Sequence, residues 1–277
     1  MSEDILLKQT IEKVREILGD EIKDIIVERA VLGLFFTGVK LNVGEGGLCF
    51  TPIKEIPEAV CCPSSARAMP MSGKLQGRSV EKYLEDIFSG NILRRALGIA
   101  VLNALSTYCW TKPMEKDYDI IESKDAFDDL VFKKGEKTVV IGALVPVLRT
   151  LIAGDYDFKV LEMDSSTLKG KELDHYAPAE DYPKYVPQAD HVIITGVTIL
   201  NDTLLDILKI AKPGADILVT GPTASMLPDA FFDEGVTTMG GIIVTDADEC
   251  LDIIAEGGSG YHFFGKSAER LILKKKS

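Results

Sequence analysis

Residues 189–221 read ADHVIITGVTILNDTLLDILKIAKPGADILVTG, and this stretch decides the fold. Two short apolar runs, HVIIT and DILVT, flank the helical pattern DTLLDILKIAK. Strands that alternate with helices are typical of a parallel sheet with helices on both faces. Three further apolar runs, TVVIGA, FKVLEMD and TTMGGIIVTD, extend the alternation to five strands. The sequence therefore predicts a Rossmann-like α/β domain over residues 137–277.

The first part of the chain has a different pattern. Helical periodicity over residues 3–18 is followed by Val-, Ile- and Phe-rich strands within 23–42 and by a short strand at 48–53. Helices are expected over 80–89, capped by Ser79, and over 92–106, which is apolar nearly all round and so buried. We predict an α+β domain over 1–112 and a charged surface connection over 113–136.

Composition excludes several classes of partner. The 277 residues are 46% hydrophobic and 27% charged, with a formal net charge of −12, so neither part offers the basic field that binds nucleic acid. No apolar run is long enough to cross a bilayer, and the N-terminus has acids where a signal peptide has bases. We expect a cytoplasmic protein that binds a small molecule, neither nucleic acid nor membrane. Nothing in the sequence specifies an oligomeric state.

The cysteine pattern argues against both a disulfide framework and a closed zinc site. The count is odd, no CxxC pair occurs, and the histidines lack metal-ligand spacing. Adjacent Cys61 and Cys62 point opposite ways on an extended chain, which favours buried small side chains over a thiolate metal site. The residues concerned are Cys49, Cys61, Cys62, Cys109, Cys250, His175, His191 and His262.

Ligands of an open parallel sheet bind beyond the carboxyl ends of the strands, and that rule nominates a site. No GxGxxG occurs, so a plain βα turn at Gly142 is favoured over a pyrophosphate cradle. Glu162, twenty positions later, either accepts hydrogen bonds from ribose hydroxyls or lies in a solvent-exposed loop. Asn201 is expected to cap the helix that follows the strand HVIIT. The candidate ligand-binding residues are Gly142, Pro146, Glu162, Thr195, Gly196, Asn201, Thr203, Gly221, Pro222 and Thr223.

A loop in the first part is a second candidate for the same ligand. Between Glu58 and Glu81 there is no acid, and residues 63–78 carry Arg67, Lys74 and Arg78 among glycines and serines. In a chain of net charge −12, a segment that binds an anion or closes over one is favoured here over an ordinary linker.

The strings VVIGALVPVL, VLEMD, ADHVIITGVTILNDTLLDIL, ADILVTGPTASMLPDAFFDEGV and NILRRALGIAVLNALS resemble a prokaryotic family described as a putative heavy-metal chelation domain. The resemblance covers essentially the whole chain. It implies an N-terminal domain shaped like that of enolase, a Rossmann-like domain, and a site in the cleft between them. The likeness to enolase concerns shape alone, because the magnesium-binding carboxylates of enolases belong to a barrel domain that this chain lacks. The family has no assigned activity.

Two functions stay open at this point. The first is the binding of a small anionic metabolite, adenosyl-type cofactor or metal chelator in the cleft. The protein would then catalyse group transfer in chelator metabolism, with Glu162 orienting the ligand or acting as general base. The alternative is a non-catalytic protein that binds a heavy metal or its chelate. Direct coordination of a divalent metal would use Cys61, Cys62, Glu45 or His262.

Overall fold

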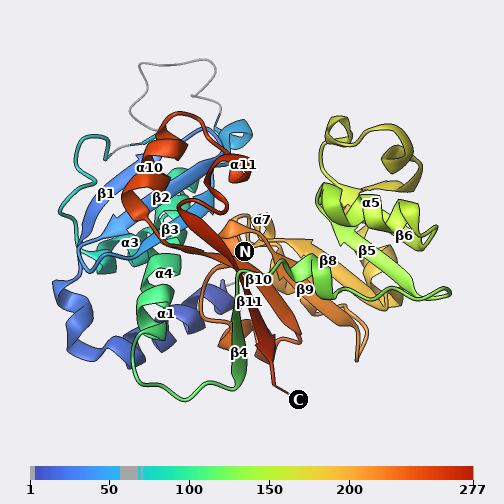
Figure 1. Ribbon diagram of the computed structural model, residues 1–277, viewed down its shortest axis with the longest axis horizontal. Coiled ribbons are helices and arrows are strands. Elements are labelled where there is room, and N and C mark those ends of the chain that lie inside the picture. The colour runs from blue at the N-terminus through green and yellow to red at the C-terminus, as the bar shows by residue number, and fades with distance from the viewer. Residues whose placement is uncertain (1–3, 57–67, 70, 277) are drawn as a thin grey trace.

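The computed structural model of the chain describes residues 4–56, 68–69 and 71–276, and all its strands join one 11-stranded mixed sheet (Figure 1). The sheet order is β1-β2-β3-β10-β9-β8-β5-β6-β7, while β11 pairs with β10 and with β4. The strands are β1 Val27–Leu32, β2 Phe36–Leu41, β3 Gly46–Phe50, β4 Tyr118–Glu122, β5 Lys137–Ile141, β6 Asp157–Glu162, β7 Tyr176–Pro178, β8 His191–Thr195, β9 Asp216–Thr220, β10 Thr238–Val244 and β11 Ala268–Lys275.

Six of these strands form the parallel part of the sheet. In sheet order they are β7-β6-β5-β8-β9-β10, and each of the five adjacent pairs is parallel. Numbered along the chain this order is 3-2-1-4-5-6, in which the direction of winding reverses between β5 and β8. The predicted α/β class is confirmed. The sequence did not indicate β7, whose three residues carry no periodicity.

Helices form where periodicity predicted them over 3–18, 80–89 and 92–106, while the helix expected over 202–212 is the five-residue α8, Leu204–Leu208. The helices are α1 Ile5–Leu18, α3 Val80–Asp86, α4 Ile92–Trp110, α5 Val145–Ala153, α6 Tyr182–Tyr185, α7 Val197–Leu200, α8 Leu204–Leu208, α9 Asp229–Asp233, α10 Ala247–Ala255 and α11 Gly260–Phe263. Asn91 caps α4 by accepting a hydrogen bond from the Arg94 N–H. Helix α4 packs on β2 and β3 and is buried along most of its length, as its apolar composition predicts.

The two ends of the chain interleave. Val244 of β10 pairs with Gly46 of β3, which makes the sheet continuous from the N-terminal half (residues 4–112) to the C-terminal half (residues 137–276). Helix α10 of the C-terminal half packs on β1 and β2 of the N-terminal half, as Figure 1 shows. The largest hydrophobic core contains residues of both halves. The domain boundaries and the enolase-like shape of the first domain stay predictions.

The charged connection over 113–136 contains a strand that the sequence analysis did not identify. Strand β4 pairs with β11, which lies between β4 and β10. Lys274 and Lys275 are the last residues of β11, and their side chains are exposed. Among the described residues, no helix combines the length and apolar character needed to cross a membrane.

Candidate functional site

A cavity of about 570 Å³ lies at the reversal of winding, beyond the carboxyl ends of β5, β8 and β9. This is the place where open α/β sheets bind ligands. Six of the residues nominated from the sequence line it: Pro146, Thr195, Gly196, Gly221, Pro222 and Thr223. Both halves of the chain contribute to its walls, because Phe35, Phe36 and Phe50 face it from the N-terminal half.

Other nominated residues lie elsewhere. Gly142 does not line the cavity; a Cβ on it would come within 2.8 Å of Thr195 Cγ2, and its φ of +94° also favours glycine. Glu162 lies at the end of β6, and its Oε1 accepts hydrogen bonds from the backbone N–H groups of Met163 (2.8 Å) and Asp164 (3.2 Å). The turn of the chain itself therefore occupies that carboxylate oxygen.

Asn201 and Thr203 follow α7, and neither lines the cavity. Asn201 does not cap the next helix as predicted: α8 begins after Thr203, and the Thr203 hydroxyl donates to Asn201 Oδ1 at 2.7 Å. The hydrogen bond between the side chains of Thr203 and Asn201 takes the place of a cap on α8.

The predicted anion-binding loop does not reach the cavity with its described cations. Arg78 donates to the carboxylate of Asp86 at the end of α3, whose side chain is 3% exposed, so this arginine is already paired with an acid. Lys74 is exposed and does not line the cavity. Arg67 lies outside the described residues.

Three charged residues that the sequence analysis missed line the cavity: Lys124, Asp125 and Arg270. Arg270 Nε donates to Asp125 Oδ2 at 2.9 Å, and its guanidinium lies 4.4 Å from the centre of the Phe264 ring. Lys124 Nζ pairs with Asp129 Oδ1 at 2.6 Å. The lining thus carries two cations and one carboxylate in a protein of net charge −12.

The loop after β9 is fixed by groups from the N-terminal half. Asn103 of α4 is 1% exposed, and its Nδ2 donates to Leu48 O at 2.7 Å and to Pro222 O and Thr223 O at 3.2 Å each. The backbone N–H of Phe50 donates to Thr223 Oγ1 at 3.0 Å. These bonds determine where the loop stands relative to the aromatic wall of the cavity.

A serine and a histidine approach each other on the rim of the cavity. Ser259 Oγ lies 3.2 Å from His262 Nδ1, and the Ser259 N–H donates to the same nitrogen at 3.0 Å. Both contacts close the first turn of α11, which is the arrangement of a capping box. The pair is therefore explained by the local structure and indicates no nucleophile with its base.

The described residues do not fit a resident heavy-metal ion. No group of three or more histidine, cysteine, aspartate or glutamate side chains among them could hold one. Burial raises the pKa of the Cys49 and Cys109 thiols to about 12 and that of Cys250 to about 11, which disfavours the thiolate that a soft metal needs. Burial also raises the pKa of Glu45. Cys61 and Cys62 lie outside the described residues.

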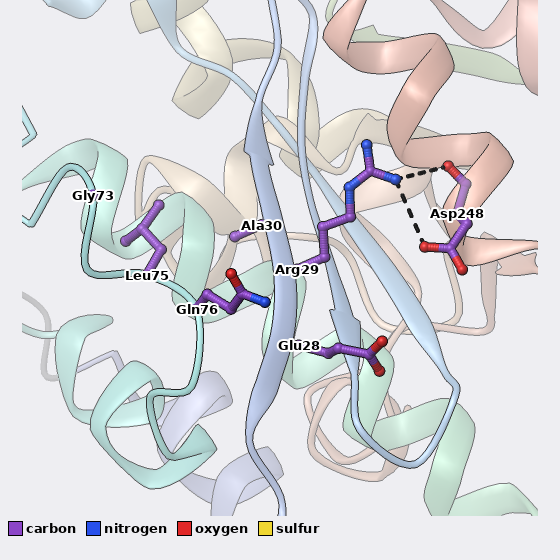
Figure 2. A pocket seen from close by; sticks show the side chains of 7 residues that line it. All are labelled: Glu28, Arg29, Ala30, Gly73, Leu75, Gln76 and Asp248. Carbon is purple, nitrogen blue, oxygen red and sulfur yellow. Dashed lines mark hydrogen bonds and ion pairs between the residues drawn. The ribbon is translucent and has the colours of Figure 1, made fainter.

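A second hollow, of about 510 Å³, lies beside β1. Figure 2 shows the Arg29 side chain directed toward Asp248 of α10, while Leu75 and Gln76 lie on the other side of the strand. Arg29 pairs with Asp252 at 2.5 Å and with Asp248 at 3.6 Å. Because two carboxylates neutralise this arginine, the second hollow is less suited to bind an anion than the cavity at the carboxyl ends of β5, β8 and β9, which we call the strand-end cavity. Arg29 therefore provides a matched control for Arg270.

One ion pair joins the halves beside the strand ends, and it predicts a pH dependence. Lys54 Nζ lies 2.6 Å from Asp164 Oδ2; this bond, with those from Ser166, lowers the pKa of Asp164 to about 2. A carboxyl group whose pKa is lowered on folding stabilises the folded state at pH values above its unfolded pKa of 3.8. This stability is lost as the pH falls through about 2. We expect Lys54→Met to lose less stability than wild type between about pH 5 and about pH 2, measured by urea unfolding.

Lys23→Met is the control, because Lys23 pairs with Asp20 within one turn and joins no separate segments. It should follow the wild type. Equal acid sensitivity of wild type and Lys54→Met would contradict the role of the Lys54–Asp164 pair.

Comparison with known proteins gives the family. A family described as "Putative heavy-metal chelation" (DUF364) matches residues 125–273, more than half of the chain. The chain belongs to the DUF364 family. A second family of the same description, DUF4213, matches residues 15–106. An uncharacterized protein of Methanocaldococcus jannaschii is 31% identical over 193 residues, which are 69% of this chain and 70% of the relative.

Two solved structures of the DUF364 family share the fold. The protein of Pyrococcus horikoshii is 22% identical with a TM-score of 0.76, covering 97% of this chain and 99% of that one. The protein of Desulfitobacterium hafniense is 19% identical with a TM-score of 0.70, covering 97% and 100%. Both are described as proteins with unknown function, so they establish the architecture and leave the ligand to be argued from the cavity.

Proposed function

We propose that this DUF364 protein binds a small organic molecule with an acidic group in the strand-end cavity, in the cytoplasm. An anionic metabolite, an adenosyl-type cofactor and a metal chelator are the three candidates. The observation that carries the proposal is the cavity itself: about 570 Å³, at the reversal of strand order, walled by aromatic rings from both halves. Its volume is within the range of small-molecule sites.

The lining supports an organic ligand with an acidic group. Phe36, Phe50 and Phe264 offer apolar surface, while Gly196 and Gly221 allow a ligand to approach the backbone at two strand ends. Arg270 is held between Asp125 and the Phe264 ring with its side chain 45% exposed, so it can bind a further carboxylate or phosphate. A nucleic acid does not fit this balance of charge.

A ligand that is itself a metal chelator would connect this proposal with the family description of heavy-metal chelation. Because the described side chains provide no metal site, a metal would enter the cavity already held by its organic chelator. An adenosyl-type cofactor carries its own transferable group, and group transfer from it would require positioning by the protein rather than a protein nucleophile. Thermal-shift measurements separate these cases.

The test uses three probes: S-adenosylmethionine, pyridine-2,6-dicarboxylate with and without Ni²⁺, and Ni²⁺ alone. A ligand present at about 100 times its Kd stabilises the folded state by about 2.7 kcal/mol, a clear rise in melting temperature. We expect at least one organic probe to stabilise the wild type, and Arg270→Gln to weaken its binding about tenfold or more, because a charge-assisted hydrogen bond is lost.

Arg29→Gln serves as the matched control, since Arg29 is also paired with aspartates but lies beside the second hollow. It should leave the affinity unchanged. Stabilisation by Ni²⁺ alone, with neither organic probe active, would refute the proposal and support direct metal binding. Loss of affinity in both arginine variants would place the ligand outside the strand-end cavity.

A further inference from the structure

Tyr261 is an exposed aromatic residue on the rim of the strand-end cavity. Its side chain is 98% exposed, although it belongs to α11 and lines the cavity. A tyrosine in this state contributes little to folding, because burial of its ring is what would stabilise the protein. Phe263, two residues later, is fully buried and packs edge-on against Phe36 at 5.5 Å. The short helix is thus anchored by one ring and presents the other to solvent.

The segment that carries Tyr261 has a defined geometry. Gly257 and Gly265, with φ of +79° and +71°, turn the chain into and out of it. The contacts between Ser259 and His262 hold the helical turn together. Tyr261 is therefore held by an ordered turn, and its exposure is a built feature of that turn.

A second exposed ring belongs to the same rim. Phe35, in the turn between β1 and β2, is 44% exposed and also lines the cavity. The two segments adjoin, since a Cβ on Gly257 would lie 4.0 Å from the Leu34 side chain. Two solvent-facing aromatic rings thus border a cavity that holds Arg270 on its wall.

We infer that Tyr261 is a specificity-determining residue that stacks on a planar, conjugated ring of the ligand, whose acidic group faces Arg270. This inference rests on the proposed function and narrows it to ligands that combine a flat ring with an anionic group. Aromatic faces attract such rings in offset stacking, and Tyr offers this surface at low conformational cost because its side chain has few rotatable bonds. Bound ligand would remove the Tyr261 ring from water.

The test titrates the full-length protein with two ring-bearing probes, S-adenosylmethionine and pyridine-2,6-dicarboxylate, and with citrate, an anionic chelator without a ring. Isothermal calorimetry on wild type, Tyr261→Ala and Tyr261→Phe gives the affinities. At least one ring-bearing probe should bind the wild type. We expect Tyr261→Ala to lower the affinity for that probe about tenfold. Tyr261→Phe should keep the wild-type affinity, because stacking needs the ring and not the hydroxyl. Citrate affinity should be the same in all three proteins.

Phe88→Ala is the matched control, because Phe88 is 43% exposed and lies outside the cavity lining. It should bind like the wild type. If a ring-bearing probe binds wild type and Tyr261→Ala equally, the inference fails; loss of that binding in Arg270→Gln would leave the proposed function standing. If only citrate binds, the inference fails alone. If no probe binds, both fail. A change of oligomeric state in Tyr261→Ala, seen by sedimentation, would assign the ring to a protein interface and overturn the inference.

Discussion

Replacing Asn103 with alanine is expected to lower the free energy of unfolding by about 2–3 kcal/mol and to weaken ligand binding. Asn103 is buried, and its one amide group donates to carbonyls of β3 and of the loop after β9. Alanine removes these donors and leaves a void between α4 and the loop. Since Pro222 and Thr223 line the cavity, the loss reaches the site as well as the fold.

Urea unfolding and calorimetric titration measure the two effects separately. Thr107→Ala is the control one turn along α4, where the hydroxyl donates only to Asn103 O of the same helix, at 3.3 Å. It should change stability by less than about 1 kcal/mol and leave affinity unchanged. If Asn103→Ala loses stability but binds the probe as tightly as wild type, the loop does not depend on Asn103 for its position.

Asp86→Ala should destabilise the protein by about 3–5 kcal/mol, the largest effect that we expect. The Asp86 side chain is 3% exposed and accepts hydrogen bonds from both Arg78 and Arg94. The guanidinium of Arg78 also lies 4.7 Å from the centre of the Tyr83 ring, so its place in the interior is fixed. Without the carboxylate, two partly buried cations face each other with no counter-charge.

Glu81→Ala tests whether any lost ion pair on α3 has this effect. Glu81 pairs with Arg15, but both side chains are substantially exposed, and such pairs contribute about 1 kcal/mol or less. Chemical unfolding of both variants gives the comparison. Similar losses in Asp86→Ala and Glu81→Ala would contradict the view that burial of the carboxylate makes it important.

The parallel sheet could be predicted because its signal is local. Each run such as HVIIT or DILVT is apolar, short and followed by a helical pattern, and the rule for parallel strands then places their carboxyl ends together. Thr195, Gly196 and Gly221 were nominated on that basis, and they line the cavity. Strands β4 and β11 were missed because they form through long-range pairing, which no local pattern encodes.

The charged wall of the cavity could not be predicted for the same reason. Lys124 and Asp125 come from the connection between the halves, and Arg270 comes from β11, so only the tertiary pairing of β4, β10 and β11 brings them together. Arg78 shows the opposite error. The lack of acids in its own segment suggested an anion-binding loop, whereas Asp86, eight positions later, neutralises it.

The position of α10 has a consequence for synthesis on the ribosome. Residues 247–255 cover β1 and β2, and β10 provides the strand that continues the sheet from β3. While the polypeptide is being translated, the part of the early hairpin that α10 covers therefore stays exposed until most of the protein has emerged. Contacts so distant in sequence favour slow folding, and the nascent chain would gain from a chaperone that shields this hairpin.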